Sequence, residues 1–451
     1  MRPNKPGQSN SSSWISKANH SHIIRDEFIQ DFLKGCRFPE KPGEDLQETN
    51  QIITDIVGKV DGTKHILTVD GSYITVDVKK EYPSSTVAFF QFGAILFTTD
   101  DLKNLSQAPF IFPEDMNKFH NLQKIKLVLP IKNVISCHQN SLNRSVRKAI
   151  YEFFMRDVSN DVTLMQTLAW IIFEEYTETK NESYTLSSNP NLDSELGNII
   201  LRKSEMKKDF TFEVDGDVIY LTDIFRLHEA IDEELGAGGI LGYVSRLIEQ
   251  MILVRYIKVI YGLKSDALRD FCFISNGPLS FSGQTANMHK PFRKLCNFML
   301  KKHNLCLFGL ETKGAFIDHA LSICQISDSG FRLGKGKCLI LSNDYIYSYI
   351  TPGDSASMHY GSTSYYGGKV IVHTDDGQVF VVSVPVENKD VILSPTQQDY
   401  PNLDTVVGVI KLLKCEMYED TIVPVALANK LISLTNHPSQ KILETFAKKF
   451  V

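Results

Sequence analysis

The stretch Lys64–Tyr73, KHILTVDGSY, carries an acidic residue and a glycine inside an otherwise apolar run. Apolar residues continue to Val76, which predicts a strand, and a second apolar run at 87–97 (VAFFQFGAILF) predicts the next antiparallel strand. A third run at 124–135, KIKLVLPIKNVI, extends this pair into a meander. Asp70 is then an acid on the first strand of the meander.

Asp70-Gly71 also fits a plainer interpretation, because Asp-Gly between apolar segments is the strongest short-range signal for a β-hairpin turn. The chain has further Asp-Gly pairs that are typical of ordinary turns: Asp61-Gly62, Asp215-Gly216 and Asp376-Gly377. The dipeptide alone does not distinguish a functional carboxylate from a turn, so the surrounding elements have to decide.

Length and charge bound the class of protein. A chain of 451 residues predicts two or three folding units, and its 22% charged and 43% hydrophobic residues are typical of a soluble globular protein. The net charge of −5 argues against a uniformly basic nucleic-acid coat. A local basic groove stays compatible with it, since a protein that binds nucleic acid needs cations only along the path of the bound strand.

The cysteines and the N-terminus bear on the compartment. Eight cysteines are scattered without a C-x-x-C pair, which is typical of reduced thiols and not of a disulfide framework or a zinc site. The N-terminal residues, MRPNKPGQSNSSSWISKANHS, lack the apolar core of a signal peptide. No apolar run approaches the roughly 18 residues that span a bilayer. We therefore expect a cytoplasmic protein that does not engage a membrane.

The first 58 residues are predicted to be an N-terminal arm. The first 21 are rich in Ser, Asn, Pro and Lys, which indicates disorder. Ile23–Phe38 has apolar residues at helical spacing and predicts an amphipathic helix that ends before Pro39. The apolar face of this helix could pack on its own domain or on a partner subunit. Packing on its own domain is favoured, since most such faces join a core.

A second informative element is the helix predicted over Leu241–Tyr261, LGYVSRLIEQMILVRYIKVIY, which is apolar on nearly every side and should be buried. Glu249 is its one charged residue between Arg246 and Arg255. A lone carboxylate in a buried helix costs several kcal/mol unless it is paired or binds a metal. Glu249 is therefore either a metal ligand, or the partner of one of these arginines, or it reaches solvent at one edge.

The remaining elements follow from periodicity and turn residues. We expect a hairpin over 210–222, strands over 271–274, 305–310 and within 338–350 and 369–384, and helices over 141–176 (interrupted near 157–160), 289–302, 402–416, 424–435 and 438–450. The strand at 271–274 runs into Asn276-Gly277-Pro278-Leu279. The strand at 305–310 runs into Glu311-Thr312-Lys313.

The order of these elements points to a chemistry. An acid on the first strand of a meander, a glutamate on a buried helix and a polar residue after the next strand follow the order in which ribonuclease-H-like folds collect ligands for one or two Mg²⁺ or Mn²⁺ ions. Hard cations of this kind prefer carboxylate oxygens, and two ions about 4 Å apart activate water and stabilise the leaving oxygen of a phosphodiester. We expect an α/β fold with a mixed, ribonuclease-H-like sheet flanked by helices.

At these residues the chain resembles the NurA family of DNA end-processing nucleases. The resemblance spans roughly residues 60 to 435 and rests on the preserved order of short motifs. These motifs are Val69-Asp70-Gly71-Ser72, Phe92-Gly93-Ala94, Glu249, Asn276-Gly277-Pro278-Leu279, Glu311-Thr312-Lys313 and Val423-Pro424-Val425-Ala426-Leu427-Ala428-Asn429-Lys430.

The resemblance implies a Mn²⁺- or Mg²⁺-dependent DNA nuclease that acts as a homodimer. Its expected partner is a hexameric HerA-type ATPase that pumps duplex DNA toward the nuclease, in DNA-end processing or in defence against phage. Asp70, Glu249, Asn276 and Asn429 match metal-ligand positions, and Lys313 matches a basic position that could contact the scissile phosphate. Residues 59–451 would form the nuclease domain, with a helical and hairpin insertion at about 140–235.

Two positions depart from the family pattern. The family usually has Asp where this chain has Asn276, and His or Asp where it has Asn429. An amide oxygen can bind a hard cation but brings no charge. Three alternatives stay open: a single ion, a substitute acid among Asp270, Glu311 and Asp318, or a catalytically degenerate scaffold subunit that binds DNA without cutting it. An unrelated α/β protein with coincidental Asp-Gly turns is a further alternative.

Overall fold

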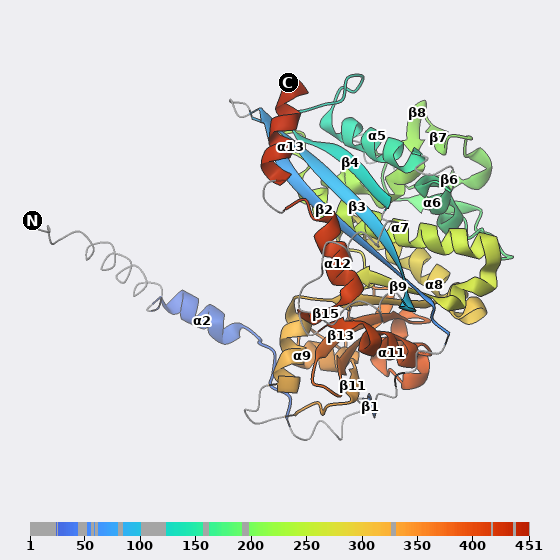
Figure 1. The fold of residues 1–451 in the computed structure, drawn as a ribbon. Coiled ribbons are helices and arrows are strands. Elements are labelled where there is room, and N and C mark those ends of the chain that lie inside the picture. Colours follow the sequence, from blue (N-terminus) through green and yellow to red (C-terminus); the bar gives the residue numbers. More distant parts are fainter. Residues whose placement is uncertain are drawn as a thin grey trace, which may run out of the picture.

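The structure is a computed structural model that describes residues 24, 26–43, 52–55, 58, 62–79, 84–100, 123–156, 162–191, 198–325, 331–415, 418–435 and 439–450. Three predictions fall outside these ranges: the disorder of the first 21 residues, the helix interruption near 157–160 and the turn at Asp61. The rest of the chain is organised around one mixed sheet (Figure 1).

The sheet has nine strands in the order β1-β11-β12-β13-β10-β9-β2-β3-β4. Their bounds are β1 Ile52–Asp55, β2 His65–Lys79, β3 Ser85–Thr98, β4 Gln123–Lys132, β9 Phe271–Asn276, β10 Cys306–Glu311, β11 Lys337–Ile340, β12 Gly367–His373 and β13 Val379–Pro385. β2, β3 and β4 form the predicted antiparallel meander, and β9 and β10 run parallel to β2. The predicted α/β class with a mixed sheet is confirmed.

Helices cover both faces of this sheet (Figure 1). Their bounds are α5 Leu142–Met155, α6 Leu164–Ile172, α7 Leu241–Lys264, α8 His289–His303, α9 Ala315–Gln325, α10 Asn343–Tyr349, α11 Leu403–Leu413, α12 Val423–Ile432 and α13 Ser439–Ala447. Alternate residues of β2 separate the two faces, because side chains along a strand point to opposite sides. Leu67 and Val69 join the core built with α5 to α8, whereas Ile66 joins the core built with α11 and α12.

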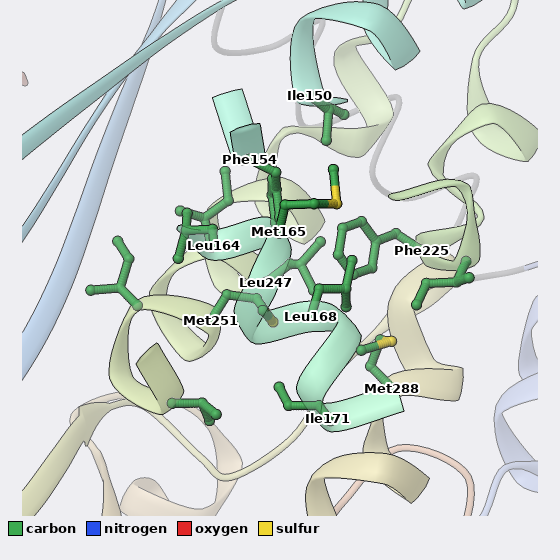
Figure 2. Packing of buried hydrophobic residues seen from close by; sticks show 14 of the residues in the cluster. Ile150, Phe154, Leu164, Met165, Leu168, Ile171, Phe225, Leu247, Met251 and Met288 are labelled. Atoms are coloured by element: carbon green, nitrogen blue, oxygen red, sulfur yellow. The ribbon is translucent and has the colours of Figure 1, made fainter. Parts of the chain in front are cut away.

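The helix predicted to be buried is α7, and the prediction is confirmed. Met251, Ile252, Leu253 and Val254 are each 1% exposed or less, as expected for four consecutive apolar residues that point to all sides of a helix. Figure 2 shows side chains of α7, including Leu247, packed against α6, which together with α5 belongs to the same hydrophobic cluster. Within the described residues, no helix is both long enough and apolar enough to cross a bilayer.

The segment predicted as an insertion lies between β4 and α7. Besides α5 and α6 it forms two hairpins, β5 Ser183–Leu186 with β6 Ile199–Arg202 and β7 Thr211–Val214 with β8 Asp217–Tyr220. The second hairpin is the one predicted over 210–222. It turns at Asp215-Gly216, where both residues have positive φ (51° and 84°), as a two-residue turn of type I′ requires. Within this segment, a buried ion pair between Arg147 and Asp223 (2.7 Å) fastens α5 to the residues that follow β8.

The prediction of strand structure up to Ile350 is wrong beyond β11. The chain leaves the sheet after Ile340 and forms the short helix α10. Ser342 caps this helix, since its hydroxyl accepts a hydrogen bond from the Tyr345 amide (3.3 Å), and Tyr345 and Ile346 are buried. A local cap and a core-facing helical side therefore outweigh the β propensity of the apolar residues.

The N-terminal helix, α2 Glu27–Gly35, was expected to pack on its own domain, and that expectation is wrong within the described residues. Its apolar residues Phe28, Phe32 and Leu33 are 81%, 65% and 53% exposed, and none of its residues is buried. Figure 1 shows the helix projecting away from the sheet and its covering helices. The amphipathic pattern predicts an apolar face correctly but does not say what covers it.

Truncation of Leu247 to alanine tests the α7 core. Leu247 is 1% exposed, so Leu247→Ala should lower the free energy of unfolding by about 2–5 kcal/mol through lost contacts and a cavity. Leu263→Ala on the same helix, at a side chain that is 83% exposed, should change it by no more than about 0.5 kcal/mol. Urea unfolding midpoints measure both, and equal midpoints for the two variants would contradict this account of α7.

Candidate metal centre

The candidate site forms where β9 ends and β2 continues. β9 pairs with β2 from His65↔Phe271 to Val69↔Ser275, so Asp70 is the first residue of β2 without a β9 partner. β3 stays paired along this stretch, with Gly93 opposite Asp70. Asp70-Gly71 therefore lies within a strand and is not a turn. Because the sheet parts beside Asp70, side chains from both faces can meet there.

On one side of the opening, Asn276 links Asp70 to Asn429. The Asn276 amide nitrogen donates hydrogen bonds to Asp70 Oδ1 (2.9 Å) and to Asn429 Oδ1 (3.1 Å). Asn276 is the last residue of β9, and Asn429 lies on α12. Asp70 is 5% exposed, whereas Asn429 is on the surface, so the cluster is open to solvent on its α12 side. The structure thus brings together three of the predicted site residues.

Two hydrogen bonds fix the end of α12 over the meander. The Gln91 side chain on β3 donates to the Ile432 carbonyl (2.9 Å), and the Ser72 hydroxyl on β2 accepts from the Leu434 amide (3.0 Å). The helix itself buries Val425, Leu427 and Ala428 against the sheet. These contacts determine where Asn429 lies.

Glu249 approaches the opening from α7, on the other face of the sheet. Its carboxylate accepts a hydrogen bond from Ser245 Oγ (3.1 Å) and forms an ion pair with Arg246 (3.4 Å). A Cβ atom at Gly71 would lie 2.6 Å from Glu249 Oε1, so only glycine leaves room for the carboxylate beside β2. The predicted alternative of an arginine pair is realised with Arg246, while Arg255 donates to the Val162 carbonyl (2.6 Å).

The electrostatics of the site disfavour its charged form in the absence of a cation. Burial raises the pKa of Asp70, against the lowering effects of the Asn276 amide, the Gly71 N–H and the Arg246 charge. The pKa of Glu249 is raised to about 7, because burial raises it more than the Arg246 charge lowers it and the Asp70 charge adds to the rise. The two carboxylates therefore repel each other in a poorly hydrated place, which a bound cation would relieve.

The residues present fit one hard divalent cation. Within the described ranges no group of three or more His, Cys, Asp and Glu side chains could hold a metal ion. The donor set at the opening is instead two carboxylates and two amides, from Asp70, Glu249, Asn276 and Asn429, and oxygen ligands of this kind suit Mg²⁺ or Mn²⁺. Two carboxylate charges balance one dication.

The acids considered as substitutes are engaged elsewhere. Asp270 precedes β9, at the opposite end of that strand from Asn276, and pairs with Lys64 (3.1 Å). Glu311 is buried and pairs with Lys369. Asp318 lies in the first turn of α9, a helix that packs on β13. The structure therefore does not bring any of the three into the cluster of Asp70 and Glu249.

Lys313 lies near the same edge but outside the cluster. It follows the end of β10, whose Leu310 pairs with Asn276 of β9, and its side chain is exposed. In the part of the chain that the structure describes, no hydrogen bond or ion pair links Lys313 to the four clustered residues. Its phosphate-binding role stays a prediction.

Sequence reasoning treated Arg246 only as a possible partner of Glu249 and missed its wider contacts. Its guanidinium also donates to the backbone carbonyls of Asn276 and Pro278. Residues three and four apart share one face of a helix, so the spacing of Arg246, Glu249 and Gln250 signals that all three point the same way. Gln250 indeed reaches the same place: its amide oxygen accepts from the Ser275 hydroxyl on β9 (2.7 Å) and from the Arg246 guanidinium (3.1 Å).

The comparisons with known proteins give a likeness of structure. No protein-family model and no curated protein matches the chain. Among solved structures, the chain is similar to the NurA nuclease from Sulfolobus solfataricus, with 8% identity, a TM-score of 0.33, and 99% of this chain and 98% of that chain covered. It is also similar to a structure of NurA with manganese, with 7% identity, a TM-score of 0.27, and 97% of each chain covered.

Both structures come from the family that the sequence was found to resemble. At identities and TM-scores this low, what this chain does has to be inferred from its own side chains.

Substitution of Gly71 tests how Glu249 reaches β2. In Gly71→Ala the new Cβ would lie 2.6 Å from Glu249 Oε1 and 2.8 Å from the Phe92 ring, so one of them must move. We expect a loss of about 1–3 kcal/mol in the free energy of unfolding and weaker Mn²⁺ binding. Thermal unfolding and calorimetric titration with Mn²⁺ measure the two effects.

Gly242→Ala is the matched control, because a Cβ there meets nothing within 4 Å on an exposed position of α7. This variant should gain about 0.5–1 kcal/mol from helix propensity. If Gly71→Ala bound Mn²⁺ as the unmodified protein does, Glu249 would not need the space beside β2.

The raised pKa of Glu249 predicts a pH dependence of the metal-free protein. A carboxyl whose folded-state pKa is about 7, above its ordinary 4.5, stabilises the fold below pH 4.5 and loses that contribution as pH rises through 7. Thermal unfolding in EDTA should therefore show the stability of the unmodified protein, relative to Glu249→Gln, falling as pH rises over this range. A difference between the two proteins that stays constant with pH would contradict the shift.

Proposed function

We propose that the protein is a divalent-metal-dependent DNA nuclease that hydrolyses phosphodiester bonds at the site of Asp70, Glu249, Asn276 and Asn429. The observation that supports this most is the meeting of two desolvated carboxylates from opposite faces of the sheet, at a place open to solvent beside Asn429. The resemblance of the sequence to NurA nucleases rests on the same residues.

The residues have separable roles in this proposal. Asp70 and Glu249 would hold a Mg²⁺ or Mn²⁺ ion, with Asn429 and Asn276 as neutral oxygen ligands. Such an ion supplies a more acidic water and stabilises the charge that develops on the leaving oxygen. In the structure Asn276 turns its NH₂ group toward Asp70, so its amide would have to rotate to offer its oxygen. Lys313, exposed near the same edge, would contact the DNA phosphate.

A second candidate function is a catalytically degenerate subunit that binds DNA or caps a translocase. The observation that favours it is the same Asn276 amide, which is neutral and already donates to Asp70 and Asn429. A carboxylate at position 276 would raise the negative charge of the cluster and strengthen cation binding. The two candidates therefore differ in whether this site cuts DNA as it stands.

We further propose that the protein works with a hexameric HerA-type ATPase and as a homodimer, in DNA-end processing or defence against phage, in the cytoplasm. The exposed aromatic face of α2 supports a protein partner, because Phe28 and Phe32 lie uncovered within the described part of the chain. Exposed apolar side chains clustered on one helix face are typical of a protein–protein contact. The seven cysteines from Cys36 to Cys338 are free thiols, the form that a reducing compartment maintains.

Cleavage of linear duplex DNA tests the nuclease. With Mn²⁺ or Mg²⁺ the protein should degrade the DNA, and a HerA-type ATPase with ATP should raise the rate. Asp70→Asn and Glu249→Gln should each lower the rate by at least about 100-fold, because ion-mediated stabilisation of the transition state is worth several kcal/mol. Gel electrophoresis of end-labelled DNA measures the rates.

Asp270→Asn is the matched control. Asp270 is an acid directly before β9, at the opposite end of that strand from Asn276, and it pairs with Lys64. Its rate should equal that of the unmodified protein. Intact DNA in every reaction, with and without the ATPase, would contradict the nuclease. If the unmodified protein were silent and Asn276→Asp cut DNA, the degenerate scaffold would be the correct function.

A further inference from the structure

We propose that Arg246 is a positioning residue that fixes the turn after β9 and thereby orients the Asn276 side chain toward Asp70. This inference rests on the proposed metal site, because orientation matters there only if Asn276 and Asp70 act together. Arg246 is 16% exposed, and the structure directs its guanidinium inward, toward backbone carbonyls and Glu249. It would therefore act on the site without touching the DNA.

The guanidinium joins three groups that belong to two elements. It donates to the carbonyls of Asn276 and Pro278 in the turn and pairs with Glu249 on α7 (3.4 Å). A planar fork with five N–H donors suits this task, because it can serve separate acceptors at fixed angles. A single ammonium group cannot reproduce that pattern. The contacts tie a backbone turn and a candidate metal ligand to one side chain.

The rest of the turn is shaped around these contacts. Gly277 has φ of 93°, a conformation that favours glycine, and a Cβ atom added there would lie 3.5 Å from the Arg246 guanidinium. On the next helical turn of α7, the Gln250 amide oxygen accepts a hydrogen bond from Ser275 Oγ (2.7 Å), and Gln250 is itself 1% exposed. α7 therefore holds the end of β9 and the turn at three residues, Ser275, Asn276 and Pro278.

A second side chain, from β13, also holds this turn, through a hydrogen bond between uncharged groups. Ser383 Oγ accepts a hydrogen bond from the Leu279 amide (2.7 Å). Gly309 on β10 leaves the space for the turn, since a Cβ there would lie 2.4 Å from the Gly277 carbonyl oxygen. Ser383 makes no contact with Asp70 or Glu249 among the described interactions. It offers a way to loosen the turn without changing the electrostatics of the site.

The experiment measures Mn²⁺ affinity by calorimetry, the rate of DNA cleavage, and metal-free DNA binding for full-length variants. Arg246→Met should weaken Mn²⁺ binding by about 10- to 100-fold and slow cleavage by a similar factor, with DNA binding unchanged. Arg246→Lys should restore little, because one ammonium cannot serve both carbonyls and Glu249. Ser383→Ala should weaken Mn²⁺ binding by about 5-fold, the worth of one neutral hydrogen bond.

Arg255→Met is the matched control. Arg255 is a buried arginine on the same helix that donates to the distant Val162 carbonyl, so its loss tests general damage to α7. It should leave Mn²⁺ affinity unchanged. Normal Mn²⁺ affinity in Arg246→Met would overturn the proposal. So would normal affinity in Ser383→Ala together with loss in Arg246→Met, because Arg246 would then act through the charge of Glu249 alone.

A further readout separates this inference from the proposed function. Asn276 donates both amide hydrogens in the structure, so in ¹⁵N-asparagine-labelled protein its NH₂ signals, assigned with Asn276→Asp, should be protected from exchange. Arg246→Met and Ser383→Ala should shift these signals and speed their exchange, whereas Arg255→Met should not. Shifted signals in a protein that neither binds Mn²⁺ nor cuts DNA would uphold the positioning and refute the metal site. Unchanged signals would overturn the positioning.

Discussion

The parting of β9 from β2 beside Asp70 is the constraint on which the candidate site depends. β2 is paired on both sides up to Val69 and only with β3 beyond it. A continuous sheet would separate Glu249 on α7 from Asn429 on α12, because the two helices lie on opposite faces. Because β9 ends before Asp70, no strand lies beside β2 at this point, and side chains from the two faces can approach each other there. Gly71 leaves this opening free of a side chain.

The charges around the opening form an unbalanced set. Two carboxylates, from Asp70 and Glu249, face one guanidinium from Arg246, and the remaining ligands are neutral amides. Burial makes the surplus negative charge costly, which is why the pKa of each carboxyl is raised. A single bound divalent cation would offset the free-energy cost of burying this negative charge. Without a cation, the contribution of Glu249 to stability is therefore lost as pH rises through about 7.

The sequence predicts the elements that follow a regular spacing of apolar residues. It does not predict features that depend on contacts between residues far apart in the chain. The meander and the buried helix α7 follow from apolar runs, and the order of acid, glutamate and strand end brings Asp70, Glu249 and Asn276 to one site. Arg246 could not be placed, because it binds carbonyls of a turn 30 residues away, and carbonyls leave no trace in a sequence. The exposed face of α2 was missed because periodicity does not tell what covers an apolar surface, and α10 was missed because its Ser342 cap and buried helical side outweigh the β propensity of its residues.

The central claim is that oxygens from both faces of the sheet share one ion at the opening. A crystal soaked in Mn²⁺, measured at the manganese absorption edge, tests it most directly. The account predicts an anomalous peak within about 2.0–2.3 Å of one carboxylate oxygen each from Asp70 and Glu249. A peak bound by only one of these side chains, or no peak beside Asp70 in crystals that hold Mn²⁺ elsewhere, would contradict it.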